Sequence, residues 1–319
     1  MLAVEARCVA ARVQVRCVDR GPIHLVEAGL VDQLKGLGWD VKFDGHHQFE
    51  EISAQYANDP PIGLLKNPVW SPASLRASRR LSARTPPRAS SPSRSVETTR
   101  SRWAQFLDTD HVPDAGVIWV DAHADINTLR RLTLVTSTAC PGLPPRPHCL
   151  RRRPEAANAP ASLQAMHPFS WIPSPPLLSP SRLVYIGLRD VDAGEKAILK
   201  KHGIKAFSMH EVDRYGIGKV VELAMEWLNK DYQGAHEHRP IHLSFDVDAM
   251  DPTVAPSTGT PVRGGLTFRE GHYICEAVYE TGSLVAFDLM EVNPSLADAA
   301  AVQQTVNVGC SLVRAALGE

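Results

Sequence analysis

The segment WVDAHADIN, residues 119–127, alternates acidic and imidazole side chains with small or apolar residues. Asp121, His123 and Asp125 are spaced two apart, so on an extended chain their side chains point to the same side. Asp246 and Asp248, which follow the apolar run IHLSF, have the same spacing. Converging carboxylates repel one another unless a cation lies between them. Carboxylates with a single imidazole suit Mn²⁺ or a similar divalent ion, so the spacing predicts a metal site.

Further acidic residues follow other apolar runs. Asp190 and Asp192 come after VYIGLR with Glu195 close behind, and Glu291 comes after VAFDLM. A lone DxHxD motif also occurs in acidic surface loops, and it is the second DxD at another strand end that favours a metal site. Four carboxylates around one point would share bridging ligands between a pair of ions, about 3.5–4 Å apart.

The elements that must position these residues are short apolar runs separated by helical stretches. The runs GVIWV, LVYIGL, KAFSM, IHLSFDVD and LVAFDLMEV predict buried strands, and residues 218–230 and 268–282 predict helices. This alternation predicts a parallel sheet covered on both faces, with functional residues at the carboxyl ends of its strands. Upstream, residues 21–38 predict one helix that ends at Gly36 or Gly38, and residues 39–45 predict a short strand with a turn.

Two internal stretches lack the pattern of folded sequence. Residues 71–103 are dominated by Arg, Ser and Pro, and residues 129–165 again show no regular periodicity. Such stretches bury too little apolar surface to offset the entropy of ordering them, so we expect disorder. A basic, serine-rich run can also bind RNA, which is an alternative function for residues 71–103.

Composition and charge narrow the possible partners and cellular locations of the protein. The chain has 319 residues and a formal net charge of -1, a balance that favours neither nucleic acid nor an anionic membrane as partner. No run of about 18 apolar residues is present, so no membrane span is expected. The six cysteines include no CxxC pair, which is typical of reduced thiols in a cytoplasmic protein. The acid-poor start leaves a mitochondrial location open.

Several motifs together resemble the ureohydrolase superfamily, and arginases in particular. They are DAHADIN, SFDVDAMDP, APSTGTPVRGGL and MEVNP, while LRDVDAGE and AGLVDQLKGLG resemble arginase more than agmatinase. The resemblance covers residues 18–70, 112–128 and 181–316. It implies a single domain over residues 1–319, folded as a three-layer α/β/α sandwich with a mostly parallel sheet. It also implies a dinuclear Mn²⁺ site, a homo-oligomer that is often a trimer, and hydrolysis of L-arginine to L-ornithine and urea by a metal-bridging hydroxide.

The resemblance also implies roles for individual residues. Five would be metal ligands: Asp121 and Asp246 bridging, Asp125 on one ion, and His123 and Asp248 on the other. Five would contact substrate: Asn127 at the α-carboxylate, Asp192 and Glu195 at the α-amino group, and Thr260 and Glu291 at the guanidinium. Asp125 and Glu291 would be the catalytic residues. Structural alternatives remain, because Thr260 can be a turn residue and Glu195 can complement a helix dipole.

Two family motifs are absent, and they are missing where the chain looks unfolded. The codons GGT-GGA-GAC-CAC-TCG encode the family's GGDHS, and read one nucleotide later they give VETTR, which is residues 96–100. GNLHGMP, encoded GGT-AAC-CTC-CAC-GGC-ATG-CCC, reads VTSTACP in the same shifted frame, which is residues 135–141. We therefore expect residues 71–110 and 129–170 to be out-of-frame translations that are disordered or non-native.

This hypothesis has a consequence for the metal site. The ion held by Asp121, His123, Asp246 and Asp248 keeps all its family-type ligands, whereas the other ion loses its imidazole. We expect metal occupancy closer to one ion than two, and impaired activity. The alternatives are an agmatinase-type ureohydrolase and an arginase-like chain without catalytic activity.

Overall fold

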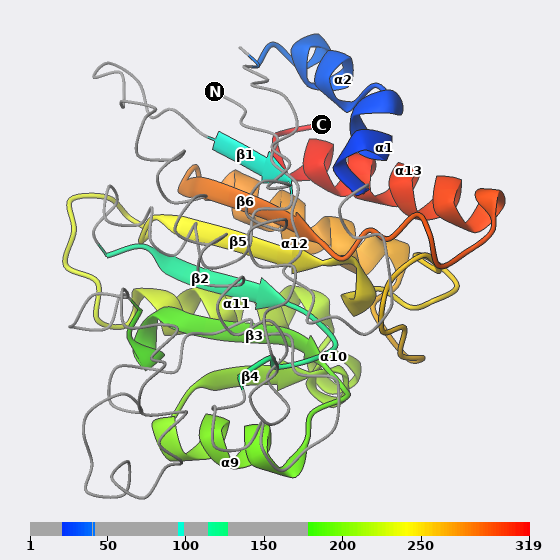
Figure 1. The fold of residues 1–319 in the computed structure, drawn as a ribbon. Coiled ribbons are helices and arrows are strands. Elements are labelled where there is room, and N and C mark those ends of the chain that lie inside the picture. Colours follow the sequence, from blue (N-terminus) through cyan, green and yellow to red (C-terminus); the bar gives the residue numbers. More distant parts are fainter. Residues whose placement is uncertain (1–20, 40, 42–94, 99–113, 127–177) are drawn as a thin grey trace, which may run out of the picture.

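The computed structural model describes residues 21–39, 41, 95–98, 114–126 and 178–319, which build a parallel six-stranded sheet (Figure 1). The strand order is β1-β6-β5-β2-β3-β4, and every neighbouring pair is parallel. The strands are β1 (Ser95–Thr98), β2 (Gly116–Val120), β3 (Leu183–Leu188), β4 (Lys205–Ser208), β5 (Ile241–Asp246) and β6 (Leu284–Met290).

Helices cover both faces of this sheet, which confirms the expected α/β sandwich. The α-helices are α1 (Gly21–Glu27), α2 (Leu30–Gly36), α9 (Ala193–His202), α10 (Met209–Tyr215), α11 (Ile217–Asn229), α12 (Phe268–Glu280) and α13 (Ala299–Ala316). Short 3₁₀ turns, η4 (Pro180–Arg182) and η5 (Val247–Ala249), precede β3 and follow β5. The larger core cluster lies between the sheet and helices α10 to α13, with α1 and α2 packed against α13. A smaller cluster around Trp119 and Tyr185 packs against Ile198 and Leu199 of α9 on the other face.

The predicted strands correspond closely to the observed ones because their side chains are buried on both faces. Every residue of β2, β3 and β5 is buried, as a central parallel strand requires. The expected strands at residues 241–248 and 284–292 are each two residues too long, and the one at residues 205–209 is one residue too long. Ser208 and Glu211 form a capping box that starts α10 at Met209, so the chain turns out of the sheet there.

The prediction of one helix over residues 21–38 is wrong, because the structure has two. Gly29 has φ of 84°, a left-handed conformation that ends α1 and begins α2. The side chain of Gln33 donates to the carbonyl of Ala28 and helps to close this turn. Of the strand expected over residues 39–45, only Trp39 and Val41 are described, and neither belongs to a strand.

The segments expected to be disordered or non-native fall mostly outside the described residues. The exception is β1, whose backbone pairs in parallel with β6, so part of residues 71–110 forms an edge strand where no regular structure was expected. The rest of that segment and all of residues 129–170 lie outside the described part of the chain. The assignment of residues 1–319 to a single domain therefore stays a prediction.

Within the described residues, no helix combines the length and apolar character needed to cross a membrane.

Candidate metal centre

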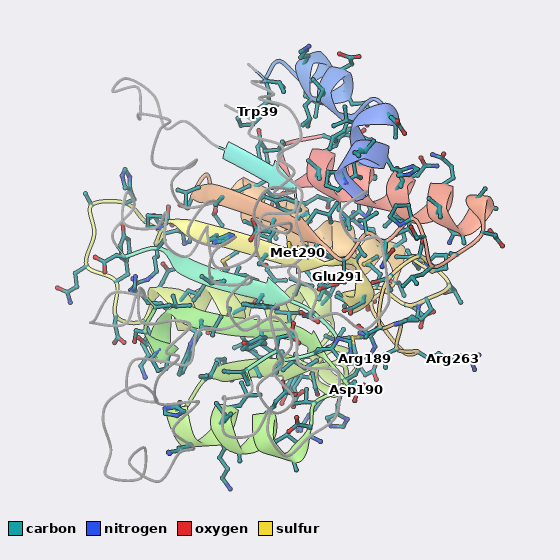
Figure 2. All side chains as sticks on the ribbon, viewed as in Figure 1. Trp39, Arg189, Asp190, Arg263, Met290 and Glu291 are labelled. Atoms are coloured by element: carbon teal, nitrogen blue, oxygen red, sulfur yellow. The ribbon has the colours of Figure 1, made fainter. Side chains whose placement is uncertain are left out.

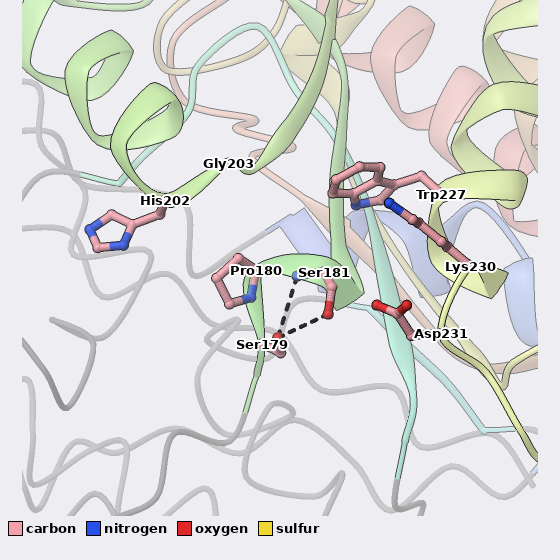
Figure 3. A pocket seen from close by; sticks show the side chains of 8 residues that line it. All are labelled: Ser179, Pro180, Ser181, His202, Gly203, Trp227, Lys230 and Asp231. Atoms are coloured by element: carbon pink, nitrogen blue, oxygen red, sulfur yellow. Dashed lines mark hydrogen bonds between the residues drawn. The ribbon is translucent and has the colours of Figure 1, made fainter.

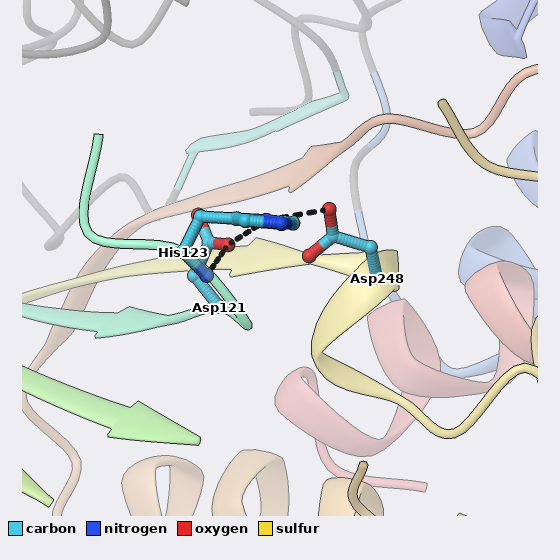
Figure 4. Close-up of side chains that lie close together, drawn as sticks. All are labelled: Asp121, His123 and Asp248. Atoms are coloured by element: carbon cyan, nitrogen blue, oxygen red, sulfur yellow. Dashed lines mark hydrogen bonds and ion pairs between the residues drawn. The ribbon is translucent and has the colours of Figure 1, made fainter. Parts of the chain in front are cut away.

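Asp121, His123 and Asp248 converge at the carboxyl edge of the sheet (Figure 4). One ligand atom from each lies within 4.8 Å of the others. Asp121 directly follows β2, and Asp248 lies in η5 at the end of the neighbouring strand β5. The Nδ1 atom of His123 lies 3.1 Å from Oδ2 of Asp248 and 3.4 Å from Oδ1 of Asp121. The two motifs therefore meet at the carboxyl edge of the sheet, as expected, through these three side chains.

Neighbouring side chains and backbone groups fix the carboxylate of Asp121. The indole Nε1 of Trp119 donates to Oδ2 at 2.8 Å, and the backbone N–H of His123 donates to Oδ1 at 2.8 Å. Trp119 can reach Asp121 because residues two apart on an extended chain point to the same side, and Asp121 directly follows β2. Tyr185 packs against Trp119 and donates its hydroxyl to the carbonyl of Ala124 at 3.0 Å, which holds the following loop.

The turn after β5 positions the second carboxylate pair. Asp246 accepts a hydrogen bond from the backbone N–H of Asp248 at 3.0 Å and caps η5. The carboxylate of Asp248 accepts from the N–H of Ala122 at 3.4 Å and from the hydroxyl of Thr260 at 3.0 Å. Asp248 is therefore connected both to the Asp121 loop and to the loop that carries Thr260.

Burial makes it costly for the side chains of this cluster to carry charge, and it shifts their pKa values. Asp121 and Asp248 are 1% and 2% exposed. Burial, followed by the charge of Asp121, raises the pKa of Asp248 above its usual range. Burial alone would lower the pKa of His123, but its contacts with Asp121 and Asp248 outweigh burial and raise that pKa to about 12. Two buried carboxylates beside one imidazole fit a site for a divalent cation, which would compensate both negative charges.

The other predicted ligands do not join this group of ligand atoms within the described residues. Asp246 is 2% exposed beside Asp248. Asp125 is half-buried and has φ of 47°, a rare conformation for a residue other than glycine.

The residues expected at the guanidinium end approach one another. Glu291 follows β6 with φ of 60°, again a strained value for a side chain of this size. A Cβ atom at Gly259 would lie 3.3 Å from its carboxylate oxygen Oε2, so Glu291 reaches the loop that carries Thr260. Figure 2 shows Glu291 at the same edge of the sheet as Arg189 and Asp190.

The residues expected at the α-amino end instead form the start of α9. Asp192 is its N-cap and Glu195 completes a capping box. Glu195 is 7% exposed, and its carboxylate accepts from the N–H groups of Ile126 and Asp192, both at 3.1 Å. Burial raises the pKa of Glu195, and those two N–H groups oppose this rise. The structural alternative thus describes Glu195 well, and its contact with substrate stays a prediction. Asn127 lies outside the described residues.

Sequence reasoning missed two residues at this edge. Trp119 orients Asp121, and Arg189 donates hydrogen bonds to several loops. The available signal was their position, since Arg189 directly follows a buried strand and Trp119 precedes Asp121 by two residues. Asp190, which the sequence placed after the same strand, has its Oδ2 3.8 Å from Nε2 of His123.

The fold and the site thus define an α/β protein with a candidate divalent-metal centre at the carboxyl edge of a parallel sheet. Residues 103–318 match the Arginase family. An arginase of Glaciozyma antarctica strain PI12 is 46% identical over 320 residues, which covers 95% of this chain and 83% of that protein. Human Arginase-1 is 42% identical over 316 residues, covering 94% and 88%.

Solved structures agree. The crystal structure of a cold-adapted arginase from the psychrophilic yeast Glaciozyma antarctica gives a TM-score of 0.64 at 38% identity, covering 100% of this chain and 94% of that one. The Bacillus subtilis arginase structure gives 0.70 at 26% identity, covering 100% and 99%. This chain belongs to the arginase family of hydrolases.

Proposed function

We propose that this chain binds Mn²⁺ through Asp121, His123, Asp246 and Asp248, and hydrolyses L-arginine to L-ornithine and urea. The observation that carries the proposal is the buried Asp121–His123–Asp248 cluster, found in a chain whose curated relatives are arginases. Buried carboxylates with one imidazole are a donor set that suits Mn²⁺. When bound, such an ion lowers the pKa of water towards neutrality and so supplies a nucleophile for hydrolysis.

Glu291 and Thr260 would receive the guanidinium group of arginine. The Glu291 carboxylate lies close to the position of Gly259 and would pair with that cation. Thr260 donates to Asp248, which ties the substrate loop to the metal cluster. Asn127 and Asp192 would bind the α-carboxylate and α-amino groups, with Glu195 holding their two loops together through its bonds to backbone N–H groups. Asp125 would take up the proton that the attacking water releases.

We further propose that a second Mn²⁺ site, built from Asp121, Asp125 and Asp246, lacks its imidazole. Strand pairing supports this. Thr98 pairs with Leu289, Leu289 with Phe245, and Phe245 with Val120, so β1 ends one row before the row of Asp246 and Asp121. The next residue in the sequence is Thr99, and in the shifted frame its place in VETTR corresponds to the His of GGDHS. The coding sequence tests this part, because a frame shift there should restore both missing motifs.

Metal counting and substrate turnover on the purified chain test the function together. We expect about one Mn²⁺ per chain, since one site keeps its ligands, and urea formation from arginine in preference to agmatine. Asp248→Asn should abolish both, whereas Asp213→Asn on the exposed side of α10 should change neither. Preferred turnover of agmatine would instead indicate an agmatinase-type enzyme. A metal-loaded chain that releases no urea from either substrate would indicate a non-catalytic member of the family.

We also propose that the chain assembles as a homo-oligomer, a trimer, in the cytoplasm. The resemblance of the chain's motifs to those of arginases implies the assembly, and the pattern of isolated cysteines supports the compartment. Light scattering coupled to size-exclusion chromatography measures the assembly, and a monomer would contradict it. Cell fractionation tests the compartment, and recovery with mitochondria would contradict the cytoplasmic assignment.

A further inference from the structure

We infer that Arg189 is a positioning residue that fixes the Asp121 loop, the Asp248 turn and the Thr260 loop relative to one another. Arg189 directly follows β3, at the carboxyl edge where Asp121 and Asp248 follow β2 and β5. Figure 2 shows it beside Asp190 at this edge of the sheet.

The backbone of Arg189 makes the first connection. Its N–H donates to the carbonyl of Ala122 at 2.9 Å, and the N–H of Asp190 donates to the same oxygen at 3.0 Å. Ala122 lies between Asp121 and His123 in the sequence, so these two bonds hold the segment that carries both side chains. Gly187, with φ of 96°, gives the end of β3 a close approach to the carbonyl of Asp121.

The guanidinium group makes the second connection, to the turn after β5. Its Nη2 atom donates to the carbonyls of Asp248 at 2.6 Å and Met250 at 3.2 Å. Its Nη1 atom donates to the carbonyl of Ala249 at 3.1 Å. One side chain therefore binds three consecutive carbonyls of the segment that carries a candidate ligand.

The third connection reaches the loop after Thr260. The carbonyl of Val262 accepts from Nη2 at 2.7 Å and from Nε at 3.2 Å. Thr260, two residues earlier, donates to the carboxylate of Asp248. Thr260 and Arg189 thus both connect this loop to the Asp248 turn, in addition to the backbone bonds of Leu266 to Ala249 and Asp251.

Only arginine suits this arrangement. Its planar group offers five N–H donors in a rigid fork, whereas lysine offers three donors on a compact ammonium at the end of a flexible stem. Burial lowers the pKa of Arg189, and the nearby charges of Asp248 and Asp121 oppose that change, so the group also places positive charge beside the carboxylates. Arg189→Lys keeps that charge and removes the fork, which separates positioning from electrostatics.

The inference rests on the metal site proposed above, and two readouts keep the two ideas separate. The first is the Mn²⁺ concentration that half-activates the enzyme, measured for the wild type and for Arg189→Lys. The second is backbone amide exchange of residues 119–126 and 246–266 in metal-free protein, which requires no metal at all. Arg263→Lys is the matched control, because Arg263 is exposed in the same loop and projects outward (Figure 2).

For Arg189→Lys we expect the half-activating Mn²⁺ concentration to rise about tenfold or more, as is usual when a partner of a metal ligand is removed. We also expect faster exchange in both segments, with Arg263→Lys unchanged in both respects. A purely structural role would lower the amplitude of activation without moving its midpoint. An unchanged midpoint together with unchanged exchange would overturn the inference. If the wild type binds no Mn²⁺, the proposed function fails, and the exchange measurement still decides whether Arg189 connects the loops.

A cavity lies at the opposite edge of the sheet from the candidate metal centre. It has a volume of about 280 Å³ and is lined by side chains that include Ser179, Ser181, Trp227, Lys230 and Asp231 (Figure 3). Lys230 lies over the ring of Trp227, with its Nζ 5.7 Å from the ring centroid. Its mixed charges select no single ligand chemistry.

Discussion

The imidazole of His123 and the carboxylate of Asp248 come from the segments that follow two different strands, β2 and β5, yet Nδ1 of His123 lies 3.1 Å from Oδ2 of Asp248. Burial opposes a charged imidazole, but Asp121 and Asp248 raise the pKa of His123 to about 12. We therefore expect the metal-free protein to hold a proton on this imidazole at neutral pH. A metal ion binds only the neutral ring, so the proton must leave when the ion arrives.

We expect Mn²⁺ binding to release this proton and to tighten by up to about tenfold per pH unit between pH 7 and 8. Because the folded-state pKa is raised, the stabilising effect of the proton is complete below about 6.5, the value of a free histidine, and is lost as pH rises towards 12. Calorimetry in buffers of different ionisation enthalpy measures the release. Binding that is independent of pH over this range, with no proton released, would contradict the expectation.

Glu195 joins two loops of the site, and its removal should cost more than removal of an ordinary capping residue. Glu195→Ala leaves the N–H groups of Ile126 and Asp192 without their acceptor, at a cost of about 1–3 kcal/mol. Glu270 occupies the same capping-box position in α12, but it is only half-buried and its carboxylate accepts hydrogen bonds from Thr267, its own N-cap. Glu270→Ala is therefore the matched control. Urea denaturation compares the two variants. Equal losses would show that the bond to Ile126 adds nothing beyond capping.

Much of the architecture could be predicted from the sequence because burial on both faces leaves an unmistakable pattern. LVYIGL is β3 without a residue of error, and the predicted strand IHLSFDVD begins where β5 begins but runs two residues past its end. The errors occur where local backbone conformation decides. Gly29 divides a periodic segment into two helices through its positive φ, and Ser208 ends a strand early because it caps the next helix. Periodicity does not encode either event.

The buried pair of His242 and Asp288 offers a test of packing beneath the site. His242 Nε2 lies 2.9 Å from Asp288 Oδ2, and both residues are fully buried. His242→Leu should destabilise the protein by about 3–5 kcal/mol, because it leaves a buried carboxylate without this partner. Adding Asp288→Leu should recover part of that loss, since the double variant buries no unmatched charge. Thermal unfolding measures all three proteins, and a double variant less stable than the single one would refute the coupling.

The candidate site was predictable in part, for a physical reason. An Asp or His at the end of a predicted strand can be recognised from its position in the sequence. Asp121, His123 and Asp248 could therefore be named from the spacing of the two motifs. The role of Arg189 was not predicted, because its partners are backbone carbonyls of loops far away in the sequence. Such contacts depend on tertiary structure, and no pattern of side-chain types in the sequence indicates them.

Metal content before and after repair of one short segment tests the proposed half-complete centre most directly. The repaired variant carries Val96→Gly, Glu97→Gly, Thr98→Asp, Thr99→His and Arg100→Ser, which restores GGDHS after the start of β1. We expect bound Mn²⁺ to rise from about one to about two ions per chain, with faster urea formation, because the second ion regains its imidazole. Two ions per chain and full arginase activity in the unrepaired protein would contradict the account.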